Sequence, residues 1–359
     1  AELGFEVHVA MWLSGVAQDN AIMQQEFGPR FHGLPYEKPL RRRESLIGKW
    51  VRRARQLVDE DARYTEGVDD WYDDRADPIL RRLDAEIGFD IAIAEYVFMS
   101  RALLALQSPR LKLIDAHDLF ANRHRLFLAA GATPQFFSTS PAEERRGLLR
   151  ADVVLGIQPA ETAVLNAYSG VQAMTFGHTV HLEVLWARQQ AAWDLLMVGS
   201  SNQMNVEGML WFGNEVMPLL LARMPGVRVA VVGGVCKATP DFAGVTKLGI
   251  VPDLQSVYAT TRLAINPVRS GTGLNIKSVE ALGYGLPLLT TQSGCRGLEA
   301  AVGQGLLVAD TPAAFVDAVA QLLPDPAKLH AMSASGYAFA ARWNDEQQTA
   351  LVQRLQAAL

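Results

Sequence analysis

The stretch NPVRSGTGLNIKSVEALGYGLP, residues 266–287, joins the end of an apolar run to a helical pattern through a glycine-rich turn. Unpaired N–H groups at the start of such a helix can hold a phosphate, and glycine lets the phosphate approach the backbone. Glu280 lies about two turns into the expected helix, where its carboxylate can accept both hydroxyls of a ribose. The stretch therefore predicts a nucleotide-binding connection. The alternative is an ordinary connection in which Lys277 and Glu280 form a solvent-facing pair.

On both sides of this stretch, short apolar runs alternate with helical patterns, which predicts parallel β-sheets covered by helices. The candidate strands fall into two sets, at 90–95, 111–118 and 152–157, and then at 195–199, 227–234, 245–249, 263–267 and 286–291. Ligands of such sheets bind beyond the carboxyl ends of the strands. The fold class expected is therefore α/β, with two doubly wound domains and a cleft between them.

The break between the two sets of strands lies near residues 175–187. We expect an N-terminal domain over 1–177, a second domain over 178–335, and a C-terminal helix over 336–359 that packs back on the first domain. Leu3–Ala10 is expected to be a strand entered from a glycine turn. Doubly wound domains often begin with a strand, a turn and a helix before such a segment, so the first strand and turn are expected to be missing.

Composition excludes several classes of protein. The 359 residues carry a net charge of −5, which argues against a nucleic-acid binder that works by bulk charge. Cys236 and Cys295 are too few for a disulfide framework or a thiolate metal site, and they suit a reducing cytoplasm. No apolar run approaches the roughly 20 residues of a membrane span.

His117 and Asp118 follow the apolar run that begins at Leu111. A histidine at a strand end can position a sugar and share a developing charge or proton. Asp118 could orient the ring or bind a hydroxyl of the acceptor. The alternative is a structural histidine satisfied by backbone groups. No spacing of histidine, cysteine and aspartate predicts a metal site.

The segment Lys38–Arg55 is strongly basic and repeats its apolar residues at helical spacing. Such a helix, here with Trp50, can lie on an anionic membrane surface. We therefore expect a peripheral membrane contact through Arg41–Arg55. The alternative is internal neutralisation by the acidic stretch 59–90.

The turn and helix from Gly271 to Gly285 resemble the donor-site signature of the retaining family 4 glycosyltransferases, in the branch with a glycine–x–glycine–leucine–x–isoleucine–lysine pattern. Other motifs of that family follow the same order over most of the chain. They are similar to its histidine–aspartate motif at Leu113–Asp118, its last N-domain strand at Arg150–Val154, its C-domain opening at Met197–Asn205, and its closing helix at Tyr337–Asn344.

The resemblance implies a GT-B fold, in which two Rossmann-like domains face each other across a cleft. It also implies a nucleotide-sugar donor held by the second domain, an acceptor held by the first, retention at the anomeric carbon and no catalytic metal or other cofactor. His117 and Asp118 would be catalytic. The donor would be bound by Gly271, Thr272, Gly273, Leu274, Lys277, Glu280, Arg269, Ser200 and Asn205.

Two features depart from the family's pattern. Thr272 stands eight positions before Glu280, where the family has the first of two glutamates. The arginine and lysine that usually bind the diphosphate are absent between Gly199 and Gly208, so Lys277 or Arg269 is expected to supply that charge.

The function implied is transfer of a sugar, typically a hexose, to a glycan or lipid-linked acceptor during cell-surface polysaccharide or glycoconjugate biosynthesis. The expected location is the cytoplasm, with peripheral contact at the inner face of the cell membrane and no nucleic-acid partner. Two other functions stay open: a nucleotide-sugar epimerase or hydrolase on the same fold, and a non-catalytic GT-B protein that binds nucleotide without turnover.

Overall fold

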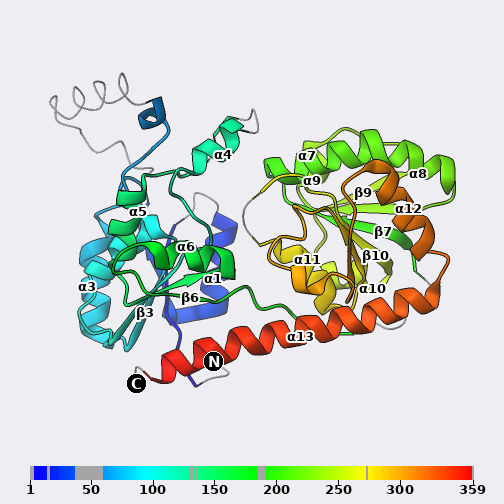
Figure 1. Ribbon diagram of the computed structural model, residues 1–359. Coiled ribbons are helices and arrows are strands. Elements are labelled where there is room, and N and C mark those ends of the chain that lie inside the picture. The colour runs from blue at the N-terminus through cyan, green and yellow to red at the C-terminus, as the bar shows by residue number, and fades with distance from the viewer. Residues whose placement is uncertain are drawn as a thin grey trace. The chain divides into compact units, whose positions relative to one another are not determined.

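The computed structural model describes residues 4–13, 17–36, 60–129, 133–134, 136–184, 191–271 and 274–357. Thr272, Gly273 and the basic segment Lys38–Arg55 lie outside these ranges, so the expected membrane contact stays a prediction. The chain forms two compact units (Figure 1). Unit 1 comprises 1–156, 161–175 and 354–359, and unit 2 comprises 157–160 and 176–353.

Unit 1 is built on a parallel sheet with the strand order β3-β4-β5-β6. These strands are β3 (Ile91–Glu95), β4 (Leu111–Asp115), β5 (Val153–Gly156) and β6 (Ala173–Thr175), and a separate parallel pair is formed by β1 (Val9–Trp12) and β2 (Phe31–Leu34). The helices are α1 (Ala17–Phe27), α3 (Ala76–Ile87), α4 (Arg123–Ala129), α5 (Pro141–Leu148) and α6 (Pro159–Ala167), with 3-10 turns at Gly28–Arg30, Glu60–Arg63 and Val97–Leu104.

The expectation of a strand over Leu3–Ala10 is wrong in its bounds, since β1 begins at Val9. The reason is pairing. A strand needs a hydrogen-bonded neighbour, and the ladder with β2 starts only at the pair of Val9 and Phe31. The runs that became β3, β4 and β5 lie within the ranges expected from the sequence.

Unit 2 contains a six-stranded parallel sheet with the order β12-β11-β10-β7-β8-β9. The strands are β7 (Trp193–Val198), β8 (Val229–Val232), β9 (Val245–Gly249), β10 (Thr261–Asn266), β11 (Leu288–Thr290) and β12 (Leu306–Val308). The helices are α7 (Gln203–Trp211), α8 (Met217–Arg223), α9 (Val235–Ala238), α10 (Leu254–Ala259), α11 (Ile276–Gly283), α12 (Pro312–Leu322) and α13 (Pro326–Gln356), with a π-helical turn at Phe212–Val216 and a 3-10 turn at Glu299–Ala301.

Both faces of the unit 2 sheet are covered, which explains why its strands read as continuous apolar runs. Successive side chains of a strand point to opposite faces. Leu195 and Met197 of β7 therefore pack with α7, α8 and α12, whereas Leu196 packs with α10 and α11. The expected α/β fold class, with two sets of parallel strands covered by helices, is confirmed.

Helix α13, drawn in orange to red in Figure 1, begins at Pro326, earlier than the expected start at residue 336. Gly336 does not mark a boundary, because it lies inside the helix where close packing excludes a side chain. A Cβ added to Gly305, which has φ of 139°, would lie 2.4 Å from the Cα of Gly336. Gly336 therefore allows α13 to pack closely against Gly305 and does not mark the start of a helix.

Candidate functional site

The strand order of unit 2 creates a switch point between β7 and β10. From β7 the chain adds β8 and β9 on one side, and from β10 it adds β11 and β12 on the other side. In open α/β sheets, ligands bind beyond the carboxyl ends of the strands at such a point. Ser200 and Asn205 follow β7, while Arg269 and Gly271 follow β10, so four of the expected donor residues belong to this edge.

The connection after β7 leads into the N-terminus of α7 and is held by side-chain hydrogen bonds. Asn202 caps α7 by accepting a hydrogen bond from the N–H of Asn205 at 2.9 Å. The Asn205 amide in turn donates to the carbonyl and hydroxyl oxygens of Ser200, each at 3.1 Å. The Ser200 and Asn205 side chains therefore hold the turn in shape, while the helix N-terminus that they shape attracts anions.

The neighbouring turn after β8 requires glycine. Gly233 has φ of 102°, in the left-handed region, and a Cβ there would lie 2.3 Å from the carbonyl oxygen of Gly199. A side chain at position 233 would therefore push the turns after β7 and β8 apart. Glycine at this position thus allows the turns after β7 and β8 to lie close together.

Arg296, which sequence reasoning missed, is a cation that contacts the loop after β10. Its guanidinium donates to the carbonyl oxygen of Gly271. The only hint in the sequence is an arginine between glycines, at Gly294–Gly297, after β11. Folding brings this loop to the loop after β10 because the two strands are neighbours.

Lys277 and Arg269, the two cations that the sequence suggested for the diphosphate, differ in their surroundings. Lys277 is exposed on α11. The Arg269 guanidinium lies over the Trp211 ring at 4.8 Å and donates to the carbonyl oxygen of Asp310 at 3.3 Å. Arg269, Trp211 and Glu207 help to line an open cavity of about 450 Å³ beside α7. Arg269 is thus partly engaged by the protein itself.

Glu280 lies on α11 with one oxygen held by a buried partner. The Tyr258 hydroxyl donates to Glu280 Oε2 at 3.3 Å, and the Tyr258 ring stacks on Tyr284 at 4.9 Å. Burial, with the charge of Glu280 beside it, raises the pKa of Tyr258, so its hydroxyl stays protonated as a donor. This contact orients Glu280 and leaves its second oxygen for a ligand.

Leu274 was expected to bind the donor, but its side chain is buried in the core of unit 2. Any contact with a ligand at this position would have to come from the backbone. The reason is the short helix α11, whose apolar face must be covered from the turn that precedes it. Gly271 approaches α7, since a Cβ there would lie 2.6 Å from Met204 Sδ.

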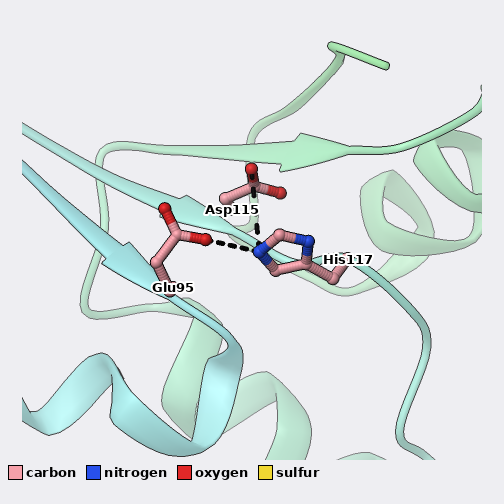
Figure 2. Close-up of side chains that lie close together, drawn as sticks. All are labelled: Glu95, Asp115 and His117. Atoms are coloured by element: carbon pink, nitrogen blue, oxygen red, sulfur yellow. Dashed lines mark hydrogen bonds and ion pairs between the residues drawn. The ribbon is translucent and has the colours of Figure 1, made fainter. Parts of the chain in front are cut away.

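Unit 1 carries a second cluster at the carboxyl ends of β3 and β4, shown in Figure 2. Glu95 and Asp115 are the last residues of these neighbouring strands and are paired in register. The Nε2 atom of His117 hydrogen-bonds to Glu95 Oε2, and it lies 3.9 Å from Asp115 Oδ2. The structure therefore places His117 at a strand end, as expected, with two carboxylates beside one ring nitrogen.

Asp118 was expected to orient the His117 ring or to bind an acceptor hydroxyl, and in the structure other residues approach the ring. The Asp118 carboxylate accepts from Arg123 Nε at 3.0 Å and from the N–H of Leu119 at 2.9 Å. The partner of His117 is Glu95 instead. A tight turn is the cause, since the N–H of Asp118 donates to the carbonyl of Ala116 at 2.7 Å and the chain reverses at His117.

Two strained residues hold this arrangement. His117 has φ of 57° and Tyr96, directly after Glu95, has φ of 67° with ψ of 143°. Such conformations cost about 1–3 kcal/mol each for residues other than glycine. The Glu95 side chain is 64% exposed, and exposed ion pairs contribute about 0–1 kcal/mol. The exposed ion pair alone therefore does not offset this strain.

The charges around His117 favour its protonated form. Burial lowers the pKa of the imidazole, but the hydrogen bond to Glu95 and the charges of Asp115 and Glu95 outweigh burial and raise it above its usual value. Burial raises the pKa of Asp115, although His117 opposes this. An imidazolium with a raised pKa can donate a hydrogen bond or a proton near neutral pH.

The same three side chains offer the donor atoms that a divalent cation uses. One atom from each of Glu95, Asp115 and His117 lies within 4.8 Å of the others. Sequence spacing does not reveal this set, because Glu95 belongs to another strand. A hydrogen bond already joins two of the three side chains, Glu95 and His117.

Glu144 of α5 anchors the loop that follows this cluster. Its buried carboxylate accepts from the N–H of Phe120 at 2.6 Å and from the hydroxyl of Tyr168 at 2.7 Å. The loop that follows His117 is thereby tied to the core of unit 1. Sequence reasoning did not single out Glu144, which reads as one acid in a helical pattern.

Residues 192–325 match the family model described as "Glycosyl transferases group 1". A curated relative, the "Uncharacterized 44.6 kDa protein in cps region" of Klebsiella pneumoniae, is 23% identical over 124 residues, which are 31% of this chain and 32% of the relative. The match thus spans about a third of that relative's length.

Several solved structures are similar in fold. Sucrose-phosphate synthase from Thermosynechococcus elongatus superposes with a TM-score of 0.60 at 17% identity, covering 79% of this chain and 78% of that one. HepE from Anabaena, solved with UDP and glucose, superposes with a TM-score of 0.57 at 12% identity, covering 96% of this chain and 90% of that one. The pneumococcal O-GlcNAc transferase GtfA, solved with UDP and GlcNAc, gives 0.57 at 14% identity over 79% and 60%.

Among the residues that the structure describes, none of the helices combines the length and apolarity needed to cross a bilayer.

The family match covers β7 to α12, and so includes the switch point and Glu280. The similar solved structures share the α/β architecture of both units. Residues 192–325 are therefore similar to the glycosyl transferases group 1 model, and the chain has the GT-B type of fold.

Proposed function

We propose that this protein is a glycosyltransferase that moves a sugar from a nucleotide-sugar donor, bound by unit 2, to an acceptor, bound by unit 1. The observation that carries the proposal is the switch point of unit 2. It lies within the residues that match the glycosyltransferase family, and it combines the α7 N-terminus, the loop after β10 and Glu280. These features suit a diphosphate and a ribose.

The proposed reaction follows from these groups. The bond between the anomeric carbon and the phosphate oxygen breaks, while a bond from the acceptor hydroxyl to that carbon forms. Negative charge builds on the departing diphosphate, where the α7 N-terminus and Arg296 stabilise it. The departing phosphate takes the proton of the acceptor, which attacks from the same face, so the sugar keeps its configuration. His117 positions the sugar.

The substrates are proposed from the relatives. HepE and GtfA were solved with UDP and a hexose or its N-acetylamino derivative, which makes UDP-hexoses the first donors to test. The Klebsiella pneumoniae relative is described as lying in the cps region. We therefore propose a glycan or lipid-linked acceptor in the biosynthesis of a cell-surface polysaccharide.

Thr272 favours one competing function. It replaces a carboxylate that the resembling family places near the sugar, which would suit a protein that binds nucleotide without turnover. A thermal-shift screen of nucleotide sugars, followed by product analysis with and without acceptor, separates the possibilities. A donor at 100 times its Kd should stabilise the protein by about 2.7 kcal/mol.

A shift with transfer to an acceptor supports the proposed function. A shift without any turnover identifies the non-catalytic alternative. Release of free sugar, or its conversion in the absence of an acceptor, identifies a hydrolase or an epimerase. If no nucleotide sugar raises the melting temperature, the proposed donor site is wrong.

Transfer should persist in EDTA. Arg296 and the α7 N-terminus supply positive charge at the proposed diphosphate site, so a divalent cation is not required there. The measurement is initial rate after dialysis against the chelator, with a mock-dialysed sample as control. Loss of turnover that magnesium or manganese restores would contradict metal independence. It would also direct attention to the cluster of Glu95, Asp115 and His117.

A further inference from the structure

We propose that Glu95 is a positioning residue for His117. It fixes the ring so that Nε2 carries the hydrogen and Nδ1 faces the sugar donor or acceptor. The inference rests on the proposed function for the identity of the ligand, but the geometry of the pair stands by itself. From the sequence, the neighbour Asp118 was one candidate for this task, whereas the structure assigns it to a residue on the adjacent strand.

The first argument is the direction of the hydrogen bond. Glu95 Oε2 meets Nε2 of His117, and an ionised carboxylate only accepts. Nε2 must therefore carry a hydrogen in both the protonated and the neutral ring, so Nδ1 either donates to a ligand as N–H or, in the neutral ring, accepts through its lone pair. Within the described part of the chain, Nδ1 has no hydrogen-bond partner. One nitrogen is thus committed to the protein and the other is left for a ligand.

The second argument is that several contacts restrict the ring to this pose. The Tyr96 ring lies 4.3 Å from the imidazole, and it stacks on Phe98 at 5.0 Å within an aromatic cluster of unit 1. The backbone of Tyr96 is held by its N–H, which donates to the carbonyl of Asp115 at 2.8 Å. The strain at Tyr96 and His117 described above is stored in the two residues that bring Glu95 and the ring together.

The third argument concerns the surrounding charges. The groups that face the imidazole are Glu95 from β3, Asp115 from β4 and the Tyr96 ring. Asp118, next in the chain, is ion-paired with Arg123. Glu95 and Asp115 are therefore the carboxylates that act on the ring, and only Glu95 hydrogen-bonds to it. Removing the charge at Glu95 should lower the pH at which His117 titrates.

The test compares Glu95→Gln with Glu86→Gln. Glu86 is an exposed glutamate of α3 that pairs with Arg82, so its variant is a matched control for the loss of one surface carboxylate. The first readout is the nitrogen-15 spectrum of histidine-labelled protein across pH, with the His117 signals assigned by their loss in His117→Ala. The wild type and Glu86→Gln should show the Nε2–H tautomer, and Glu95→Gln should show a mixture with a lower titration midpoint.

The second readout is steady-state kinetics with the donor found in the thermal-shift screen. Glu95→Gln should lower kcat about tenfold or more, because part of the population holds the wrong tautomer. KM for the donor should stay close to the wild-type value. Glu95→Asp, which keeps the charge, should retain more activity than Glu95→Gln at every pH.

The two readouts separate this inference from the proposed function. If His117 keeps the wild-type tautomer and midpoint in a folded Glu95→Gln variant, the positioning role is wrong. An altered tautomer with unchanged kcat also overturns it. An altered tautomer in a protein that transfers no sugar would support the pair and contradict the proposed function instead.

Discussion

His117→Ala should lower kcat about 100-fold or more while leaving the Kd of the donor nearly unchanged. The nucleotide is proposed to bind unit 2, whereas His117 lies in unit 1 at the end of β4. Its imidazole would act on the sugar as charge develops, and loss of a general acid, base or positioning group costs about 10²- to 10⁴-fold. The variant should therefore lose turnover, while its affinity for the donor measured by calorimetry stays close to that of the wild type.

The control for this prediction is His181→Ala. The His181 side chain is 62% exposed and pairs with Glu183 within unit 2, so its removal should leave kcat at the wild-type value. Thermal unfolding should show that His117→Ala remains folded, since the residue replaced is strained. A folded variant with unaltered kcat would make His117 a structural residue.

Glu280→Gln should raise the Kd of the donor about 10- to 150-fold. The Glu280 carboxylate is proposed to accept hydrogen bonds from the ribose hydroxyls, and bonds to a charged group contribute about 1.5–3 kcal/mol. Glutamine keeps an oxygen for the Tyr258 hydroxyl, which now donates to Glu280 Oε2. The fold of α11 should therefore persist, and calorimetry with the donor measures the change.

Tyr258→Phe provides the matched comparison. It removes the hydroxyl that orients Glu280 but leaves the carboxylate, so its effect on affinity should be smaller than that of Glu280→Gln. Equal losses in both variants would indicate that the contact between the two side chains matters and not a bond to ribose. Unchanged affinity in Glu280→Gln would exclude the ribose role.

Much of the fold could be read from the sequence because the pattern of burial is local. A strand covered on both faces must be apolar at each position, as β8 is from Val229 to Val232. The same logic predicted β4 and placed His117 at its carboxyl end. The glycine turn after β10 was also visible, since few other residues permit that backbone.

The candidate site was only partly visible. Ser200, Asn205, Arg269, Gly271 and Glu280 lie on elements that the strand and helix patterns place correctly, at one edge of the unit 2 sheet. The contacts were not visible. Leu274 has the same place in the motif but its side chain belongs to the core, because a motif does not say which way a side chain points.

By itself, the sequence determined most of the strands and the place of His117 just after β4, because the pattern of apolar residues reports which faces are buried. The short strands β2, β6 and β12 were not predicted. Tertiary structure alone decided the partners. Glu95 lies 22 positions before His117, and it meets the ring only through the parallel register of β3 and β4. Arg296 reaches Gly271 because β11 pairs with β10. Strand register and loop closure are set by packing across the whole unit, and that information is absent from any single stretch of the chain.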